Sequence, residues 1–270
     1  MKTRILTGIV AIAVFITVVY LLPPVCFTVA VAVMLAIAAY ELTLRSKIVS
    51  SRAMFVCSAV FAAAMPFIFT LPNFEKYIFV HMFFCMATLF VIWLLSYGKV
   101  SLVMFQTSFF AGAIMPFLFS SIVQIRLMEN GEYMILFPFL AAWMTDTGAY
   151  FAGSFLGRHK LCEKISPKKT VEGAIGGVVI CVLSIFVFAK IMEAKFGMQV
   201  EYPLVMVGAL VLSVLSQIGD LSFSIIKREY NIKDYGSIMP GHGGVLDRFD
   251  STIFTVPASF ILLVLMGGMM

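Results

Sequence analysis

Charged residues are scarce in this sequence. Asp, Glu, Lys and Arg make up only 12% of the 270 residues, whereas 61% are hydrophobic and the mean hydropathy is +1.04. Soluble domains average about 25% charged residues, so a chain with half that share cannot cover a water-facing surface. The scarcity of charge therefore excludes an ordinary soluble protein, and lipid must be the main solvent of this chain.

Cysteine is also sparse, and the five cysteines form no C-x-x-C pair. This spacing offers neither a structural zinc site nor a disulfide framework. The first apolar run is followed by Pro23 and Pro24, without a small-residue cleavage site, and another apolar run begins at once. We therefore expect the first run to be kept as a helix rather than removed as a signal peptide.

Apolar runs, separated by Pro, Gly and charged residues, fill most of the chain. A helix needs about 20 residues to cross the hydrocarbon core of a bilayer. The expected spans are residues 5–22, 25–40, 53–71, 77–95, 102–125, 134–152, 171–189, 203–222 and 251–266. The sequence thus predicts an all-α, polytopic integral membrane protein with about nine transmembrane helices.

Basic residues are distributed unevenly across this topology. Fifteen of the 19 Lys and Arg residues fall on the side of the N-terminus, and the other four are Lys76, Arg126, Lys190 and Lys195. Cytoplasmic loops carry an excess of basic residues, so the N-terminus is expected in the cytoplasm. The long connections 153–170 and 223–250 then lie on the cytoplasmic side, and we expect a bacterial inner-membrane protein with its active site on that face.

Aspartate is absent from the first 145 residues. All five aspartates lie at or between the two long connections and their flanking helix ends: Asp146, Asp220, Asp234, Asp247 and Asp250. The sequence therefore predicts an N-terminal transmembrane scaffold, residues 1–133, and a C-terminal transmembrane catalytic region with cytoplasmic loops, residues 134–270.

One face of the predicted helix over residues 213–228 is polar. At helical spacing it presents Ser213, Ser216, Gln217, Asp220, Ser224 and Lys227. A carboxylate near a membrane helix end is costly and usually faces a protein interior or watery cavity with a partner. Asp220 is therefore a candidate functional residue, with a structural ion pair to a lysine as the alternative.

The connection over residues 233–250 is rich in glycine. Pro240, Gly241, Gly243 and Gly244 exclude regular helix and can offer unpaired N–H groups to phosphate oxygens, although no G-K-[ST] follows as in a P-loop. Asp247 and Asp250 lie three apart and could present oxygens to one Mg²⁺ ion. Capping of the following helix is an open alternative for Asp250, whereas the dense polar loop favours the metal for Asp247.

Two further stretches complete the polar set. Asp146, Tyr150 and Gly153 fall on one face of a predicted helix, and Lys164, Lys168 and Lys169 precede the next helix together with Ser166 and Thr170. Adjacent cations and a helix N-terminus are natural partners of phosphate. Contact with anionic lipid headgroups is the alternative for the lysines, but their Ser-Pro-Lys-Lys-Thr context favours substrate binding.

Residues 219–250 resemble the signature of phosphatidate cytidylyltransferases, also called CDP-diacylglycerol synthases. The matching pattern is G-D-x3-S-x2-K-R-x4-K-D-x-G-x3-P-G-H-G-G-x-L-D-R-x-D, which this chain follows without departure. The upstream stretches D-T-x-A-Y and I-S-P-K-K-T-x-E-G look like the same family. The specific resemblance covers about residues 143–251, and the N-terminal half agrees only in being polytopic.

The resemblance implies a magnesium-dependent enzyme of phospholipid biosynthesis that converts CTP and phosphatidate to CDP-diacylglycerol and pyrophosphate. The implied catalytic residues are Asp220, Lys227, His242, Asp247 and Arg248, and the implied metal ligands are Asp220, Asp247 and Asp250. The implied substrate-binding residues are Asp146, Ser166, Lys168, Lys169, Ser224, Arg228, Lys233, Asp234, Gly241, Gly243 and Gly244. A second cation and a homodimer are left open, the membrane lipid is the expected environment, and no nucleic acid is expected as a partner.

Other classes of membrane protein explain the pattern less well. An ion-coupled transporter spreads polar residues over several helices near mid-membrane and often has internal repeats, whereas these polar residues crowd at one membrane face. A CTP-dependent polyprenol or phytol kinase shares the metal and phosphate chemistry, but the complete Pro-Gly-His-Gly-Gly-x-Leu-Asp-Arg block argues against it. A purely structural scaffold leaves the density of Asp, Lys and Gly unexplained.

Overall fold

Helices dominate the structure, a computed structural model that describes residues 2–241 and 243–266. Each of the nine predicted spans falls on a helix or on consecutive helical segments. The predicted all-α fold class is therefore confirmed.

The chain divides into two compact units, each built from two stretches of sequence. The first unit combines Met1–Gln124 with Tyr230–Phe249, and the second combines Ile125–Glu229 with Asp250–Met270. The predicted division into a scaffold, 1–133, and a catalytic region, 134–270, concerns function and stays a prediction.

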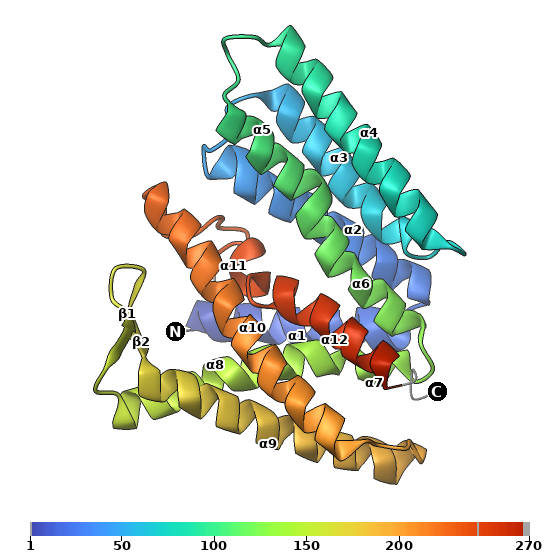
Figure 1. Cartoon of the computed structure of the whole chain (residues 1–270), viewed down its shortest axis with the longest axis vertical. Coiled ribbons are helices and arrows are strands. Elements are labelled where there is room, and N and C mark those ends of the chain that lie inside the picture. The colour runs from blue at the N-terminus through green and yellow to red at the C-terminus, as the bar shows by residue number, and fades with distance from the viewer. Residues whose placement is uncertain (1, 242, 267–270) are drawn as a thin grey trace. The chain divides into compact units, whose positions relative to one another are not determined.

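The first unit is a set of antiparallel helices with a long loop packed against it (Figure 1). Its elements are α1 (Lys2–Ile16), the π-helical turn η1 (Thr17–Leu21), α2 (Pro24–Tyr40), η2 (Glu41–Arg45), α3 (Arg52–Ile68), α4 (Phe74–Leu95), α5 (Leu102–Phe109), η3 (Phe110–Ile114), most of α6 (Met115–Leu127) and α11 (Leu246–Phe249). Pro24 begins α2, where a missing N–H costs nothing, and the Ser51 side chain caps α3 by accepting from the N–H of Met54. Within this unit α2 packs against α3, and α3 packs against α4.

The second unit contains the remaining elements. They are α7 (Gly131–Met134), α8 (Leu136–Leu156), β1 (Lys160–Cys162), β2 (Ser166–Thr170), α9 (Val171–Phe196), α10 (Tyr202–Glu229) and α12 (Thr252–Leu265). Its buried core is formed by Phe137, Ala141, Cys181, Ile185, Ala189, Val205, Ala209, Leu212 and Leu262. These side chains come from α8, α9, α10 and α12, which pack against one another.

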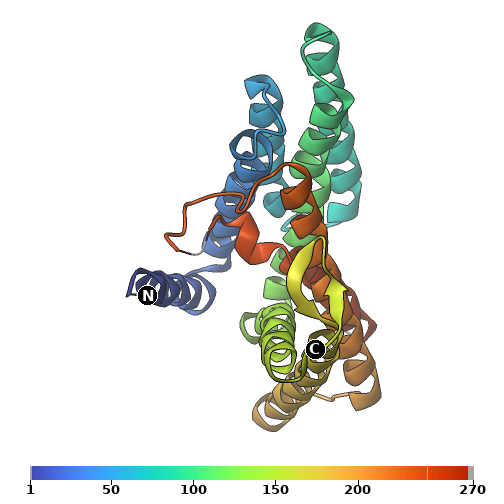
Figure 2. The same ribbon diagram turned by 90° about the vertical axis from the view of Figure 1, so that its left-hand side faces the viewer.

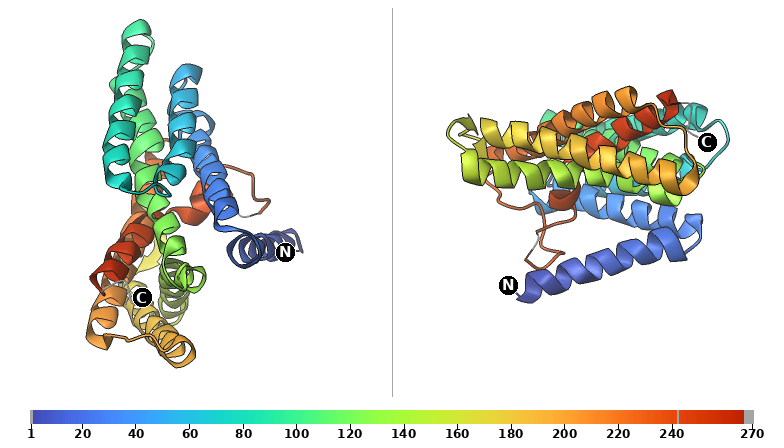
Figure 3. Two further views of the ribbon diagram at one scale, coloured as in Figure 1. Left: turned by 90° about the vertical axis from the view of Figure 1, so that its right-hand side faces the viewer. Right: turned by 90° about the horizontal axis from the view of Figure 1, so that it is seen from below.

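Glycines let α8 and α9 approach closely along their length (Figures 1 and 3). A Cβ atom on Gly173 would lie 2.8 Å from the carbonyl oxygen of Ala149, and one on Gly177 would lie 2.8 Å from that of Thr145. Small residues at such positions allow helices to pack backbone against backbone where lipid supplies no hydrophobic driving force. The close pair fixes where the C-terminal end of α8 lies against the start of α9.

Five helical segments are long and apolar enough to cross a membrane among the residues described. They are Pro24–Arg45, Phe74–Leu95, Leu102–Leu127, Val171–Phe196 and Tyr202–Glu229, and shorter apolar helices cover Thr7–Leu21, Arg52–Ile68 and Thr252–Leu265. The protein is therefore an integral membrane protein. The number of nine transmembrane helices stays a prediction, because three of the predicted spans are short and α8 carries polar residues around Asp146.

The two long connections predicted over residues 153–170 and 223–250 are shorter in the structure. The sequence predicts a long connection over residues 153–170, whereas α8 continues to Leu156 and the rest of the connection contains an antiparallel hairpin of β1 and β2. Likewise α10 continues to Glu229, seven residues beyond the apolar span that predicted it. Hydropathy detects only the apolar part of a helix, and a hairpin this short, whose second strand contains Pro167, has little strand signal of its own.

Candidate functional site

A cavity of about 470 Å³ lies between α8, the β1–β2 hairpin and α9 in the second unit. Its lining residues are Asp146, Ala149, Tyr150, Gly153, Ser154, Lys160, Leu161, Lys168, Lys169, Thr170, Gly173, Ala174 and Gln217. The structure thus brings together three of the predicted substrate-binding residues, Asp146, Lys168 and Lys169. It also confirms that Asp146, Tyr150 and Gly153 share one helix face.

An ion pair joins this cavity to the polar face of α10. The Nζ atom of Lys169 contacts Oδ2 of Asp220, and the two side chains are 26% and 25% exposed. A lysine that binds substrate and an aspartate that binds metal were predicted separately, and here they meet. The alternative role for Asp220 is a structural ion pair with a lysine, and Lys169 is the lysine that such a pair would use.

The polar face of α10 continues from Asp220 toward Asp250. Gly219 permits this approach, because a Cβ atom there would lie 2.9 Å from the carbonyl oxygen of Asp250. Oδ2 of Asp250 lies 3.9 Å from Nζ of Lys227. Burial raises the pKa of the Asp250 carboxyl to about 7, the charge of Asp220 adds to this rise, and Lys227 opposes it. Burial and the neighbouring Asp220 thus oppose the charged form of Asp250 more strongly than Lys227 favours it.

Helix capping does not account for Asp250. The N-cap position of α12 is Ser251, and Oδ1 of Asp250 accepts from the N–H of Ser251 at 2.8 Å rather than from an N–H group of the first helical turn. The Ser251 hydroxyl also donates to Oδ1 at 3.5 Å, and Oδ2, the second carboxylate oxygen, lies 3.9 Å from Nζ of Lys227. Binding of a metal ion by Asp250 stays a prediction.

No three His, Cys, Asp or Glu side chains converge as a metal site among residues 2–241 and 243–266. Mg²⁺ usually takes one or two protein carboxylates and completes its octahedron with water and substrate phosphates. Asp220 and Asp250 supply hard oxygen donors of this kind, and each lies beside a lysine, Lys169 for Asp220 and Lys227 for Asp250. Asp247 belongs to the first unit, and its role as a ligand stays a prediction.

The glycine-rich loop of the first unit is folded around carboxylates. Oδ2 of Asp247 accepts from the N–H of Tyr235 at 2.8 Å and from the N–H of Gly244 at 3.0 Å. The N–H of Gly244 is therefore already paired, whereas the sequence suggested that the loop offers unpaired N–H groups to phosphate. Gly241 and Gly243 have φ angles of +80° and +86°, a backbone conformation that side chains disfavour.

Other predicted site residues are placed less specifically. Arg228 donates from Nε to the carbonyl oxygen of Ile165 at 3.0 Å, which ties the end of α10 to the hairpin. Lys233, Asp234 and Arg248 are exposed, while Ser166 and Ser224 are half-buried. His242 lies outside the described residues. The substrate or catalytic roles of all these residues stay predictions.

Glu172 was not singled out from the sequence, although an acid in the first turn of a helix is a signal for N-terminal pairing. Its carboxylate accepts from the N–H groups of Arg158 at 3.1 Å and His159 at 3.2 Å and contacts Nδ1 of His159 at 2.6 Å. The N–H of Val171 donates to the His159 carbonyl, and that of Gly173 donates to the Thr170 side chain. The N–H groups of Val171 and Gly173 are therefore already paired, and the lysine ammonium groups are the donors that this cavity offers to a phosphate.

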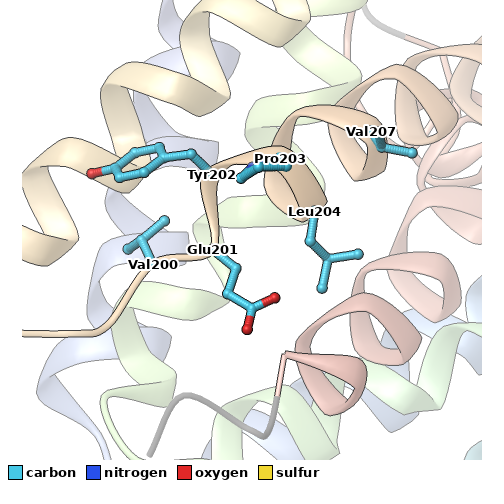
Figure 4. Close-up of a pocket in the computed structure, with 6 residues that line it drawn as sticks. All are labelled: Val200, Glu201, Tyr202, Pro203, Leu204 and Val207. Atoms are coloured by element: carbon cyan, nitrogen blue, oxygen red, sulfur yellow. The ribbon is translucent and has the colours of Figure 1, made fainter.

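A second pocket, of about 650 Å³, lies at the connection between α9 and α10 (Figure 4). Its lining residues are Val200, Glu201, Tyr202, Pro203, Leu204 and Val207. It lies at the start of α10, 18 residues before Asp220. An apolar lining with one carboxylate and no cation does not suit phosphate, so the lysine-lined cavity is the candidate site.

Comparison with known proteins identifies the family of this chain. The sequence profile of the cytidylyltransferase family matches residues 2–266. The chain belongs to the cytidylyltransferase family. The profile includes both the lysine-lined cavity of the second unit and the glycine-rich loop of the first unit.

Individual cytidylyltransferase-family relatives are similar over part of their length. The phosphatidate cytidylyltransferase of Bacillus subtilis (strain 168) is 44% identical over 148 residues, which cover 54% of this chain and 54% of that protein. Proteins of the same name from Staphylococcus saprophyticus and Staphylococcus aureus (strain COL) are 45% and 47% identical, over 50% of this chain and 51% of each relative. The chain therefore matches about half the length of these curated relatives.

Proposed function

We propose that the protein transfers the cytidylyl group of CTP to phosphatidate, releasing pyrophosphate and forming CDP-diacylglycerol in phospholipid biosynthesis. The observation that carries the proposal is the cavity lined by three lysines and connected through Lys169 to the carboxylate of Asp220. Membership of the cytidylyltransferase family and the name shared by the relatives support the same reaction.

The cavity has the size and charge that a nucleoside triphosphate requires. Its volume of about 470 Å³ lies within the usual range for small-molecule sites. Lys168 and Lys169 can make charge-assisted hydrogen bonds to phosphate oxygens, which are stronger than neutral ones. Lys160 donates to the carbonyl oxygen of Pro167 at 2.6 Å, which holds this third cation at the cavity rim.

The reaction requires positioning and charge neutralisation more than proton transfer. An oxygen of the phosphatidate phosphate attacks the α-phosphorus of CTP, a new P–O bond forms, and pyrophosphate leaves with the electrons of the broken bond. Because the attacking phosphate is already anionic, no strong general base is needed. Cationic groups fixed beside the reacting phosphates stabilise the charge of the transition state. We assign this role to Lys168, Lys169 and Lys227, with Arg248 and His242 as further candidates.

The proposed cofactor is Mg²⁺, held by Asp220 and Asp250, with Asp247 as a further ligand. When bound, the ion neutralises phosphate charge and polarises the phosphorus centre under attack. Lys169 then exchanges Asp220 for a substrate phosphate, so the ion pair keeps both side chains ordered before substrate binds. The number of cations is left open.

We place the reaction at the cytoplasmic face of the bacterial inner membrane. The excess of Lys and Arg on the N-terminal side supports this orientation. The partners are CTP, phosphatidate and the surrounding lipid; no nucleic acid is involved, and a homodimer is compatible with the proposal.

The proposal is tested by incubating the purified protein in neutral detergent with CTP, phosphatidate and Mg²⁺. We expect a CMP-bearing lipid and pyrophosphate in equal amounts, and neither product when phosphatidate or Mg²⁺ is omitted. Failure to form the lipid with any acyl composition, from protein that is folded and monodisperse, would reject the proposed reaction.

A further inference from the structure

Glu41 is a fully buried carboxyl at the end of an otherwise apolar helix. It follows the 17 residues of α2, begins η2, and is 0% exposed. A buried carboxylate is costly unless it is hydrogen-bonded, and ionisable groups in membrane helices mark functional positions by default. Its partners therefore indicate what the residue does.

Those partners are two backbone N–H groups more than 200 residues away in the sequence. Oε1 accepts from the N–H of Val245 at 3.1 Å, and Oε2 accepts from the N–H of Leu246 at 2.8 Å. Both belong to the glycine-rich loop at the start of α11 in the first unit, the loop that Figure 2 shows beside the blue helix of α2 and η2. The two oxygens thus engage adjacent N–H groups, which fixes the orientation of the peptide between them.

Two glycines make room for this carboxylate. A Cβ atom on Gly236 would overlap Oε1 of Glu41, and one on Gly244 would overlap both of its carboxylate oxygens. Neither glycine has the positive φ that would by itself require glycine. Their lack of a side chain is therefore explained by the close approach of Glu41 rather than by backbone conformation.

Asp247 holds the same loop from within. Its Oδ2 accepts from the N–H groups of Tyr235 and Gly244, so two carboxylates together engage four N–H groups between residues 235 and 246. The Tyr235 ring is completely buried beneath them. The shape of the loop that carries Asp247 and Arg248 therefore depends on a residue from a distant helix.

We infer that Glu41 is a positioning residue of the active site, which holds the glycine-rich loop so that Asp247 and Arg248 are presented for cytidylyl transfer. Glu41 does not contact substrate in this role. Because both of its oxygens are occupied by the loop, it acts through the backbone at residues 245–246. The inference rests on the proposed function for its turnover readout, but the local order of the loop can be measured independently of turnover.

The first test compares Glu41→Gln with Glu75→Gln, a matched change at an exposed acid in the first turn of α4. In Glu41→Gln an amide NH₂ faces a backbone N–H donor, so one loop N–H loses its acceptor. An unsatisfied buried donor costs enough to lower kcat roughly tenfold, with little change in the KM for CTP. Hydrogen exchange at Val245 and Leu246 should quicken by a similar factor, while exchange in α3 and α4 stays as in the wild type. Glu75→Gln should change neither quantity.

The second test is a double-mutant cycle between Glu41 and Gly236. Gly236→Ala alone should lower kcat, because its methyl group displaces the Glu41 carboxylate. In the Glu41→Ala background that carboxylate is absent, so Gly236→Ala should cost little more, and the two effects should be strongly non-additive. If Glu41→Gln does not fold, hydrogen exchange at Val245 and Leu246 in Gly236→Ala, which keeps Glu41 and displaces its carboxylate, decides the same question.

Three results would overturn the inference. They are wild-type kcat and exchange in Glu41→Gln, uniformly faster exchange across α2, α3 and α4, or additive losses in the cycle. Uniform exchange would mean that Glu41 only stabilises the fold. If the wild type transfers no cytidylyl group, the proposed function fails. Hydrogen exchange at residues 245–246 would then still show whether Glu41 protects the loop.

Discussion

Replacing Lys169 by alanine separates a structural ion pair from a substrate-binding role. Both partners of the Lys169–Asp220 pair are about one quarter exposed, so water screens the interaction. Pairs of this kind contribute up to about 1 kcal/mol to stability. A loss of that size lowers the melting temperature by about 2–4 °C in a chain of roughly this length.

The expected effect on turnover is much larger. A hydrogen bond from a charged group is worth about 1.5–3 kcal/mol. If Lys169 makes such a bond to a phosphate in the transition state, Lys169→Ala lowers kcat/KM by roughly 10- to 150-fold, since about 1.4 kcal/mol is a factor of ten. Lys164→Ala is the matched control, because Lys164 is an exposed lysine of the same hairpin that does not line the cavity.

The assay is CTP-dependent labelling of phosphatidate in neutral detergent, combined with a thermal melt of each variant. In neutral detergent phosphatidate is the only anionic lipid added, so no anionic bilayer surface is present for a residue that only anchors the hairpin to lipid headgroups. Equal kcat/KM values for Lys169→Ala and Lys164→Ala would refute the substrate role of Lys169. A shared loss in both variants would instead show that the net charge of the hairpin matters.

Three further predictions concern packing, charge and topology. Gly177→Leu should prevent stable folding, because even a Cβ atom there would lie 2.8 Å from the carbonyl oxygen of Thr145. Gly8→Leu should be tolerated, because Gly8 has open space around it. If size-exclusion chromatography shows folded Gly177→Leu protein, the packing account is contradicted. The raised pKa of Asp250 means that the folded state binds this proton more tightly than the unfolded state. In EDTA the melting temperature should therefore fall as pH rises from the ordinary aspartate pKa toward about 7, and Asp250→Asn should remove that slope. A slope that is unchanged in Asp250→Asn would exclude Asp250 as its source. A cysteine at Ser237 should react with a membrane-impermeant thiol reagent only after cell lysis, and labelling in intact cells would reverse the topology.

Much of the helical framework can be predicted from the sequence, because long apolar runs have few alternatives to a helix in lipid. Every predicted span lies on helix, and α9 begins at Val171, directly after the predicted lysines. The polar end of α10 is predicted by the polar face over residues 213–228 rather than by hydropathy, and the helix ends at Glu229. The β1–β2 hairpin depends on pairing between two short strands, which no local pattern specifies.

The candidate site could be predicted as a set of residues but not as a geometry. Asp146, Lys168 and Lys169 line one cavity formed by α8, the hairpin and α9, and their role in binding substrate stays a prediction. Glu41 is not among the residues predicted for the site, although a lone acid at the end of an apolar span is itself a functional signal. The N–H of Gly244 could not be assigned in advance, since its pairing depends on the tertiary position of Asp247.

The most direct test of the proposed reaction compares CTP labelled at the α-phosphate with CTP labelled at the γ-phosphate, each incubated with phosphatidate, Mg²⁺ and the purified protein. Cytidylyl transfer predicts that the α label appears in the lipid and the γ label in pyrophosphate. A CTP-dependent lipid kinase gives the opposite pattern, with the γ label in the lipid and the α label retained in CDP. Recovery of the γ label in lipid, or of neither label, would contradict the proposed reaction.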